Sequence, residues 1–336
     1  MDKLNMKLTD KSIMNKKVII VGGAGYIGGY MTDLLLEKGY DVTVFDNLMY
    51  EQRFLKSVKF IKGATWDKEK LSQILPEYEI VIWLAAIVGD GACAVNPKIS
   101  KRDNEDAVKW LVDNYKGKIV FTSTCSVYGK NNDLIDEEAV PNPLSVYAET
   151  KLAAERYVVE NAEDHLIFRL GTLYGLGDEH SRIRLDLVAN ILAYKAAVGE
   201  ALSVFGGDQW RPLLHVKDVS EAVAFCLENN VTGLYNLSDD NYRIKDIAEK
   251  IKEVVPETKV DYTEMEFEDQ RNYKVKNKKI LSTGWTPKHS LKEGVEEIVR
   301  VFKEQRIKDP KDPIYSNEGF LKEERRKHSG DKFELW

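Results

Sequence analysis

The chain has 336 residues, of which 43% are hydrophobic and 31% charged, and its formal net charge is −6. This length buries a large core in one large domain or two, and an acidic chain without a basic stripe argues against a nucleic-acid partner. No apolar stretch is long enough to span a membrane, the five histidines lack metal-ligand spacing, and the three scattered cysteines fit reduced thiols of a cytoplasmic protein.

The first part of the chain carries a dinucleotide-binding pattern. Residues 1–15 are polar and lacking in the apolar core of a signal peptide, so we expect a disordered leader. A buried strand at 17–21 runs into Gly22-Gly23-Ala24-Gly25-Tyr26-Ile27-Gly28, and a helix at 30–38 and a strand at 41–46 follow. Small residues let the backbone approach a pyrophosphate at a helix N-terminus. Asp46, which ends the second strand, suits the adenosine ribose hydroxyls and would repel a 2′-phosphate, so the pattern favours NAD over NADP.

Strand and helix signals then alternate as far as residue 170. Further strands are expected at 59–62, 80–84, 118–122 and 166–170, and helices at 103–114 and 146–160. Repeated units of this kind predict the α/β class, with a Rossmann-type doubly wound parallel sheet over residues 16–170. Ligands of such sheets bind beyond the carboxyl ends of the strands.

After residue 170 the pattern loosens. We expect a loop at 171–177, a helix at 185–198 and a strand at 202–205. A short strand and a helix are expected within 215–229, with a strand at 234–237 and a helix at 244–254. Residues 171–303 therefore read as a smaller mixed α/β substrate domain, with some later segments returning to the first domain. Residues 304–336 read as a charged tail with one short helix near 318–327.

Tyr147 and Lys151 lie four residues apart within the expected helix at 146–160, which places them on one face. A phenol titrates near ~10, and a neighbouring ammonium lowers that pKa by favouring the phenolate. A tyrosine tuned in this way can take a proton from an alcohol while another group takes the hydride.

With these pieces in place, the chain resembles the extended short-chain dehydrogenases/reductases, and within them the nucleotide-sugar (NAD-dependent) epimerase/dehydratase family. The likeness covers residues 17–303. It is carried by six segments in order, namely 22–28, 83–86, 123–129, 147–151, 211–219 and 269–275. Residues 181–188 and 272–275 further resemble a subgroup of bacterial sugar enzymes that includes GDP-heptose 4-dehydrogenases.

The resemblance implies the role of each site residue. Tyr147 would be the catalytic base, Lys151 would hold the nicotinamide ribose, and Thr124 would hydrogen-bond the reacting hydroxyl or carbonyl. The substrate diphosphate would bind Arg211 and Arg271, with Arg182 and Arg184 as further substrate contacts. The expected NAD contacts are Gly22, Gly25, Tyr26, Ile27, Gly28, Asp46, Asn47, Leu84, Ala85, Ala86, Tyr147 and Lys151. The alternatives are an ordinary strand-end threonine and arginines that form salt bridges or lie in solvent.

Departures from the family pattern narrow the reaction. Cys125 and Ser126 stand where the family's 4,6-dehydratases carry an Asp-Glu pair, so no acid there can protonate a leaving hydroxyl. Ser126 also stands where the double epimerases carry an acid/base cysteine. The leading hypothesis is therefore oxidation of a nucleotide-diphosphate sugar at C4, ending as a C4 epimer or as a released 4-keto sugar.

Two alternatives remain open at this point. One is an NAD(P)-dependent reductase of a non-sugar carbonyl, against which the paired arginines argue. The other is a non-catalytic dinucleotide sensor, which has no need of the Thr, Tyr and Lys set. The resemblance also implies a homodimer formed through the helices at 103–114 and 146–160.

Overall fold

The computed structural model describes residues 15–50, 53–263 and 271–328 of the chain. Most of the expected leader, the end of the charged tail and the first two residues of segment 269–275 lie outside these ranges.

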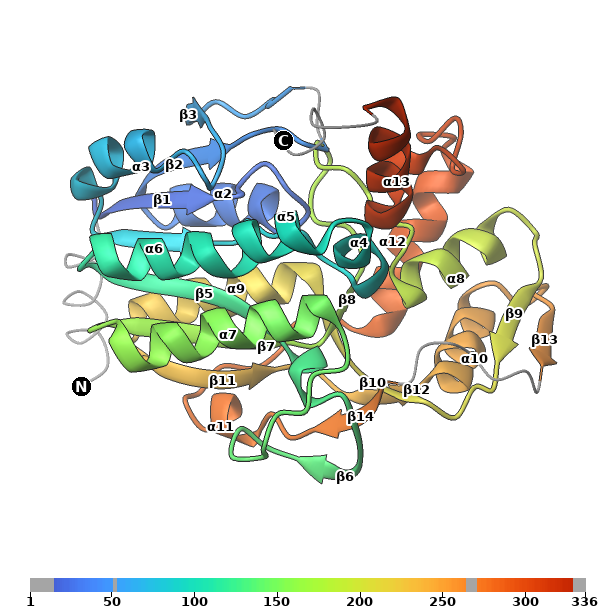
Figure 1. Ribbon diagram of the computed structural model, residues 1–336. Helices are drawn as coiled ribbons and strands as arrows, with labels where there is room; N and C mark the ends of the chain where they lie inside the picture. The colour runs from blue at the N-terminus through green and yellow to red at the C-terminus, as the bar shows by residue number, and fades with distance from the viewer. Residues whose placement is uncertain (1–14, 51–52, 264–270, 329–336) are drawn as a thin grey trace, which may run out of the picture.

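A seven-stranded parallel sheet forms the larger part of the molecule (Figure 1). Its order is β11-β7-β5-β4-β1-β2-β3, so the chain winds outward in both directions from β1. The strands are β1 (Lys17–Val21), β2 (Asp41–Asp46), β3 (Lys59–Lys62), β4 (Ile80–Trp83), β5 (Lys118–Thr124), β7 (His165–Leu170) and β11 (Gly233–Leu237). All seven strands coincide with expected ones to within two residues at either end, which confirms the predicted Rossmann-type fold.

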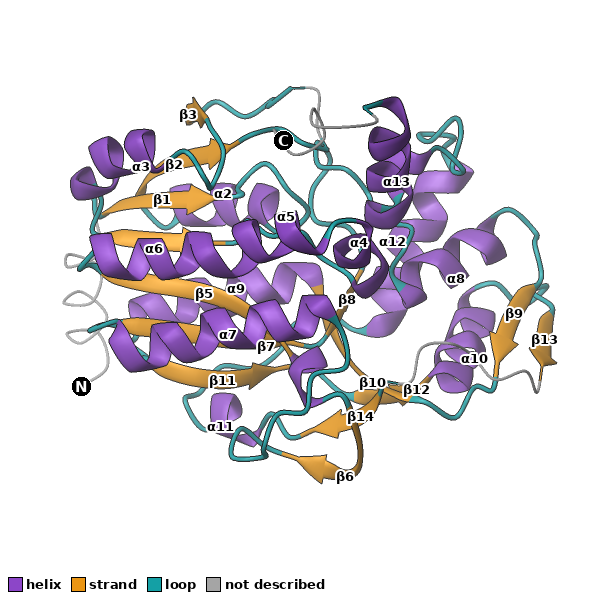
Figure 2. Cartoon of the chain, in the orientation of Figure 1, coloured by secondary structure: helices purple, strands orange, loops and turns teal. Residues whose placement is uncertain are grey.

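Helices cover both faces of this sheet (Figure 2). Because strand side chains alternate, Val18 and Ile20 of β1 pack towards α2 (Gly28–Glu37) and α9 (Val216–Glu228). Ile19 and Val21 point to the opposite face and pack in a second core with the helices of that side. Those helices are α3 (Lys68–Ile74), α6 (Ala107–Asn114) and α7 (Val146–Asn161).

The helix expected at 103–114 is present with an irregular start. A π-helical turn, Arg102–Asp106, joins α5 (Pro97–Lys101) to α6, so the run from residue 97 to residue 114 is continuous. Before it comes α4 (Asp90–Val95), which follows the carboxyl end of β4. Neither α4 nor α5 was anticipated, because both are only five or six residues long.

The smaller part has a core of its own, built around α8 (Val188–Ala197), α10 (Ile244–Val254) and α12 (Leu291–Lys303). A two-stranded sheet, β9 (Leu202–Phe205) with β13 (Val260–Thr263), flanks these helices. Two further small sheets lie near the junction of the parts. They contain β8 (Thr172–Tyr174), β10 (Trp210–His215) and β12 (Asn241–Arg243), and β6 (Lys130–Ile135) with β14 (Asn272–Val275).

Two expectations in this part were wrong. The segment 171–177 contains β8 rather than only loop, because residues 172–174 pair in parallel with residues 213–215 of β10. The helix expected from residue 185 begins at Val188, because Leu187 is extended (φ −93°, ψ 133°) and Asp186 is held by Arg184. Both differences depend on contacts that local periodicity does not report.

The C-terminal segment folds back over the molecule. A short 3-10 turn (Pro313–Tyr315) leads into α13 (Asn317–Lys327), which packs against α4 beside the carboxyl ends of the strands (Figure 1). The helix expected near 318–327 is therefore present, but it is not a free tail. The remaining short elements are the 3-10 turns Leu75–Glu77 and Cys125–Tyr128 and the helix α11 (Lys278–Leu281).

Candidate active site

A cavity of about 1170 Å³ opens at the carboxyl ends of the parallel strands, between the sheet and the smaller part. Residues from the glycine loop, from the ends of β2, β4 and β5, and from α7, α8 and α13 line it. Pockets for single ligands usually measure ~300–1,000 Å³, so this cavity has room for a dinucleotide and a second ligand together.

The glycine loop has the geometry that a diphosphate requires. Gly22 has a φ of +84°, and a Cβ there would lie 2.5 Å from the backbone nitrogen of Ala85. A Cβ at Gly28 would lie 2.4 Å from the Gly23 carbonyl oxygen, so only glycine lets α2 start this close to the loop. At Gly25, by contrast, the nearest atom to a Cβ is the Gly22 oxygen at 3.4 Å, and the residue faces the cavity. A bare backbone therefore meets the ligand at Gly25.

Asp46 ends β2 against this loop. Its carboxylate accepts hydrogen bonds from the backbone nitrogens of Ala24, at 3.1 Å, and Leu48, at 2.7 Å. Burial raises the pKa of Asp46, and these backbone donors counter part of that rise. Asn47 lines the cavity beside it. An acid held by two amides at the rim of the cavity suits ribose hydroxyls, as the sequence predicts.

The other expected cofactor contacts line the same cavity, with one difference at Tyr26. Its hydroxyl donates to the Gly175 carbonyl, at 2.5 Å, and lies 3.2 Å from Nδ2 of Asn190. The ring therefore ties the glycine loop to the smaller part, and only its backbone and ring face remain for a cofactor. Ile27, Leu84, Ala85 and Ala86 also line the cavity.

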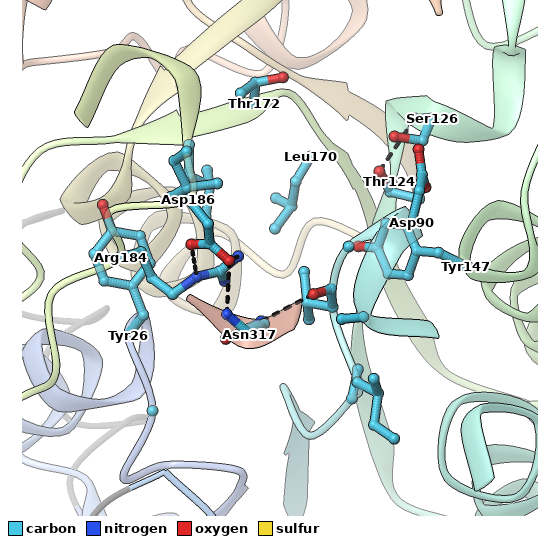
Figure 3. Close-up of a pocket in the computed structure, with 18 of the residues that line it drawn as sticks. Tyr26, Asp90, Thr124, Ser126, Tyr147, Leu170, Thr172, Arg184, Asp186 and Asn317 are labelled. Atoms are coloured by element: carbon cyan, nitrogen blue, oxygen red, sulfur yellow. Dashed lines mark hydrogen bonds and ion pairs between the residues drawn. The ribbon is translucent and has the colours of Figure 1, made fainter. Parts of the chain in front are cut away.

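Thr124, Tyr147 and Lys151 converge from β5 and α7 (Figure 3). Thr124 is 6% exposed and Tyr147 8%, and both line the cavity. The Thr124 hydroxyl hydrogen-bonds Tyr147 and also accepts from the backbone nitrogen of Ser126, at 3.1 Å. The threonine thus fixes the direction of the phenol, which leaves the Tyr147 oxygen at the surface where a reacting hydroxyl would sit.

The charge states of this group differ from expectation. Burial raises the pKa of Tyr147, whereas Lys151 is not among the causes that lower it. Lys151 is 2% exposed, and burial lowers its pKa to about 7. Its ammonium lies over the Phe121 ring, 4.2 Å from the centroid. No carboxylate of the described residues lies within ion-pair distance of it, so desolvation governs both groups in the protein alone.

Arg211 and Arg271 come together as expected. Nη1 of Arg211 donates to the backbone carbonyls of Trp210, at 2.8 Å, and Arg271, at 2.5 Å. The Arg271 side chain reaches into the cavity, with Nε 3.2 Å from Oδ2 of Asp90 and Nη1 3.3 Å from Oγ of Ser126. Arg211 therefore positions the segment that presents the Arg271 guanidinium.

Arg182 and Arg184 line the cavity, but their guanidinium groups bind protein. Arg184 forms two hydrogen bonds to the carboxylate of Asp186, at 2.6 and 3.0 Å (Figure 3). Arg182 lies 4.2 Å from the centroid of the Tyr50 ring and donates to the Ile314 carbonyl and to Oδ1 of Asn317, both at 2.5 Å. They hold the loop after β8 and the start of α13.

Two residues of the site were missed. Asp90 lies in the cavity beside Tyr147 and Ser126 (Figure 3), and it could have been found because it follows the carboxyl end of a predicted strand. Asn317 binds Val88, Arg182 and Asp186, and no local signal links it to residues so distant in sequence.

Within the described ranges, no three or more His, Cys, Asp or Glu side chains are grouped so as to hold a metal ion. None of the helices there has the length and apolarity to cross a membrane.

A Rossmann-type sheet with a glycine loop at β1 and a Tyr-x-x-x-Lys helix facing it defines an extended short-chain dehydrogenase/reductase. Residues 18–238 match the NAD dependent epimerase/dehydratase family, and the chain belongs to that family. NAD is thus the cofactor, as the sequence predicts. The open face at Gly25, the carboxylate of Asp46 and the buried ammonium of Lys151 fit it.

Individual relatives agree on the fold and differ in their reactions. The chain is 27% identical over 304 residues to a UDP-glucose 4-epimerase of Corynebacterium glutamicum, covering 82% of this chain and 92% of the relative. It is 26% identical over 332 residues to a UDP-N-acetyl-alpha-D-glucosaminuronate decarboxylase of Bacillus cytotoxicus, covering 87% and 99%. A solved UDP-glucose 4-epimerase of Thermus thermophilus in complex with NAD superposes with a TM-score of 0.75 at 25% identity, covering 86% and 99%.

Proposed function

We propose that this enzyme oxidises the C4 hydroxyl of a nucleotide-diphosphate sugar with Tyr147 as the base. The observation that carries the proposal is the arrangement of one cavity. The Thr124–Tyr147 pair lies at its chemical end, and the Arg211–Arg271 pair supplies a guanidinium suited to a diphosphate. A sugar diphosphate held at Arg271 extends towards Tyr147.

Each residue then has one task. Thr124 orients the reacting hydroxyl, and Tyr147 takes its proton. NAD, when bound, supplies the acceptor and donor of the hydride. Lys151, whose ammonium is buried beside this helix, holds the nicotinamide ribose. If the keto sugar turns in the cavity before reduction, the product is the C4 epimer. If it leaves first, the enzyme is a 4-dehydrogenase.

UDP is the first nucleotide to test, because relatives are named for UDP-sugars. Dehydration is disfavoured at positions 125 and 126. Cys125 is fully buried with its Sγ 3.2 Å from the Arg169 carbonyl, and burial raises its pKa. We also infer a cytoplasmic location and a homodimer formed through α6 and α7. The dimer is supported by the partly exposed Val159, 46% exposed on the outer side of α7.

The function is tested by incubating the enzyme with NAD and a panel of UDP-, GDP-, CDP- and dTDP-sugars, and by following sugar products by NMR and NADH by absorbance. We expect a C4 epimer or a 4-keto sugar from at least one substrate. The absence of both from every member of the panel would contradict the proposal.

The diphosphate site is tested with Arg271→Ala and with Arg306→Ala, an exposed arginine beyond α12, as the control. Arg271→Ala should weaken binding of the active nucleotide sugar at least about tenfold while NAD binding stays unchanged. Unchanged sugar binding would favour the non-sugar reductase instead.

A further inference from the structure

Asp90 places a carboxylate inside the reaction cavity that none of the assigned roles uses. It is the first residue of α4, and its side chain is 31% exposed. Oδ1 accepts a hydrogen bond from the Ser145 hydroxyl, at 2.7 Å, and Oδ2 lies 3.2 Å from Nε of Arg271. Figure 3 shows its side chain beside Tyr147, Thr124 and Ser126. Two partners from separate segments thus fix its position.

The carboxylate lies between the two ends of the expected substrate. Towards α7, its negative charge raises the pKa of Tyr147, so it is electrostatically close to the base. Towards β14, it contacts Arg271, which we assign to the diphosphate. A sugar that spans from Arg271 to Tyr147 therefore passes Asp90.

A carboxylate held by a guanidinium and a hydroxyl accepts hydrogen bonds and donates none. It suits the hydroxyl or amino groups of a sugar, and it repels a sugar that carries its own carboxylate. This distinction matters among the relatives, since one is named for UDP-glucose and another for a glucosaminuronate.

We propose that Asp90 is a specificity-determining residue: it accepts hydrogen bonds from the sugar ring and excludes nucleotide sugars that bear a carboxylate. The inference rests on the proposed function. The competing explanation is that Asp90 only neutralises Arg271. In that case replacing Asp90 would change the binding of all nucleotide diphosphates by one common factor.

The test measures binding calorimetrically on NAD-loaded protein carrying Tyr147→Phe, so that no ligand is converted. The ligands are UDP-glucose, UDP-glucuronate and UDP. We expect UDP-glucose to bind about 10- to 100-fold more tightly than UDP-glucuronate, as for like charges a few ångström apart at a partly wet site. Adding Asp90→Asn keeps the shape and an acceptor for Ser145, and should reduce that ratio to within about threefold.

Asp41→Asn is the matched control, because Asp41 is exposed at the opposite end of β2. It should leave the ratio unchanged. Asp90→Ser is the second charge-removing variant should Asp90→Asn fail to fold. If removal of the Asp90 charge leaves the ratio unchanged, or if UDP-glucuronate already binds as tightly as UDP-glucose, the selectivity proposal is overturned.

Failure of the proposed function gives a different result. If UDP does not bind, the measurement is repeated with GDP, GDP-mannose and GDP-mannuronate. No binding of either nucleoside diphosphate would overturn the assignment of the diphosphate site itself. Binding of a nucleoside diphosphate with an unchanged sugar ratio overturns only the role of Asp90.

Discussion

The guanidinium of Arg182 donates a hydrogen bond to Oδ1 of Asn317, which lies 135 residues later in the chain. Asn317 also donates from Nδ2 to the Val88 carbonyl, at 2.9 Å, and from its backbone to Oδ2 of Asp186, at 2.8 Å. One residue at the start of α13 thus joins the loop after β4 to the loop after β8, both of which line the cavity.

Asn317→Ala removes two of these hydrogen bonds and leaves polar partners short of acceptors and donors. A loss of about 1–3 kcal/mol of unfolding free energy is expected, together with a several-fold higher KM for the sugar. Denaturant unfolding and steady-state kinetics measure both effects. Asn229→Ala, at the exposed end of α9, is the control and should change neither. A normal KM in Asn317→Ala would show that α13 does not shape the cavity.

Tyr147→Phe should lower kcat about 10²- to 10⁴-fold, because the only group lost is the hydroxyl that takes the proton. NAD affinity should stay within a few-fold. Tyr157→Phe is a matched control on the same helix, since its hydroxyl binds Asp113 at the surface. Equal rates for the two variants would remove Tyr147 from its proposed role.

Lys151→Met should stabilise the NAD-free protein and abolish turnover. Below about pH 7 the folded protein carries a buried ammonium, and its full cost is present. Above that pH the folded lysine loses its proton while the unfolded one keeps it up to about 10.5, so the cost declines as the pH rises. The gain in unfolding free energy should be roughly 2 kcal/mol larger at about pH 6 than at about pH 9. A gain independent of pH would place the ammonium in solvent.

Glu297 of α12 provides a second pH-dependent contribution, away from the cavity. Burial alone would raise its pKa, but His215, the Leu176 backbone nitrogen and Lys217 bind the carboxylate and together lower the pKa to about 2. Its stabilisation is therefore present above about pH 4.5 and is lost as the pH falls towards about 2.

Glu297→Gln should destabilise the protein at neutral pH. Its deficit relative to the unmodified protein should shrink by about 1 kcal/mol between about pH 6 and about pH 4. Urea unfolding at the two values measures this change. Glu160→Gln, exposed near the end of α7, is the control, and a deficit that stayed constant with pH would contradict the linkage.

The sequence predicted the large sheet well because its signals are local. The apolar runs that became β1, β4 and β5 are buried on both faces, and such runs are distinctive in sequence. The glycines and the Tyr147–Lys151 spacing are equally local. The start of α8, the pairing of β8 and the docking of α13 depend on partners more than about 30 residues away or on a single charged pair, so periodicity could not reveal them. The protonation of Lys151 depends on burial, which spacing alone does not report.

The return of β11 to the edge of the large sheet limits how the chain can be recombined. A chimaera that joined this sheet to a relative's sugar-binding part by a single crossover at residue 170 would lose its own edge strand, together with α9. An exchange of substrate preference between such enzymes needs at least two crossovers, on either side of the segment from β10 to β11. Single substitutions such as those at position 90 are the simpler evolutionary route to a new sugar.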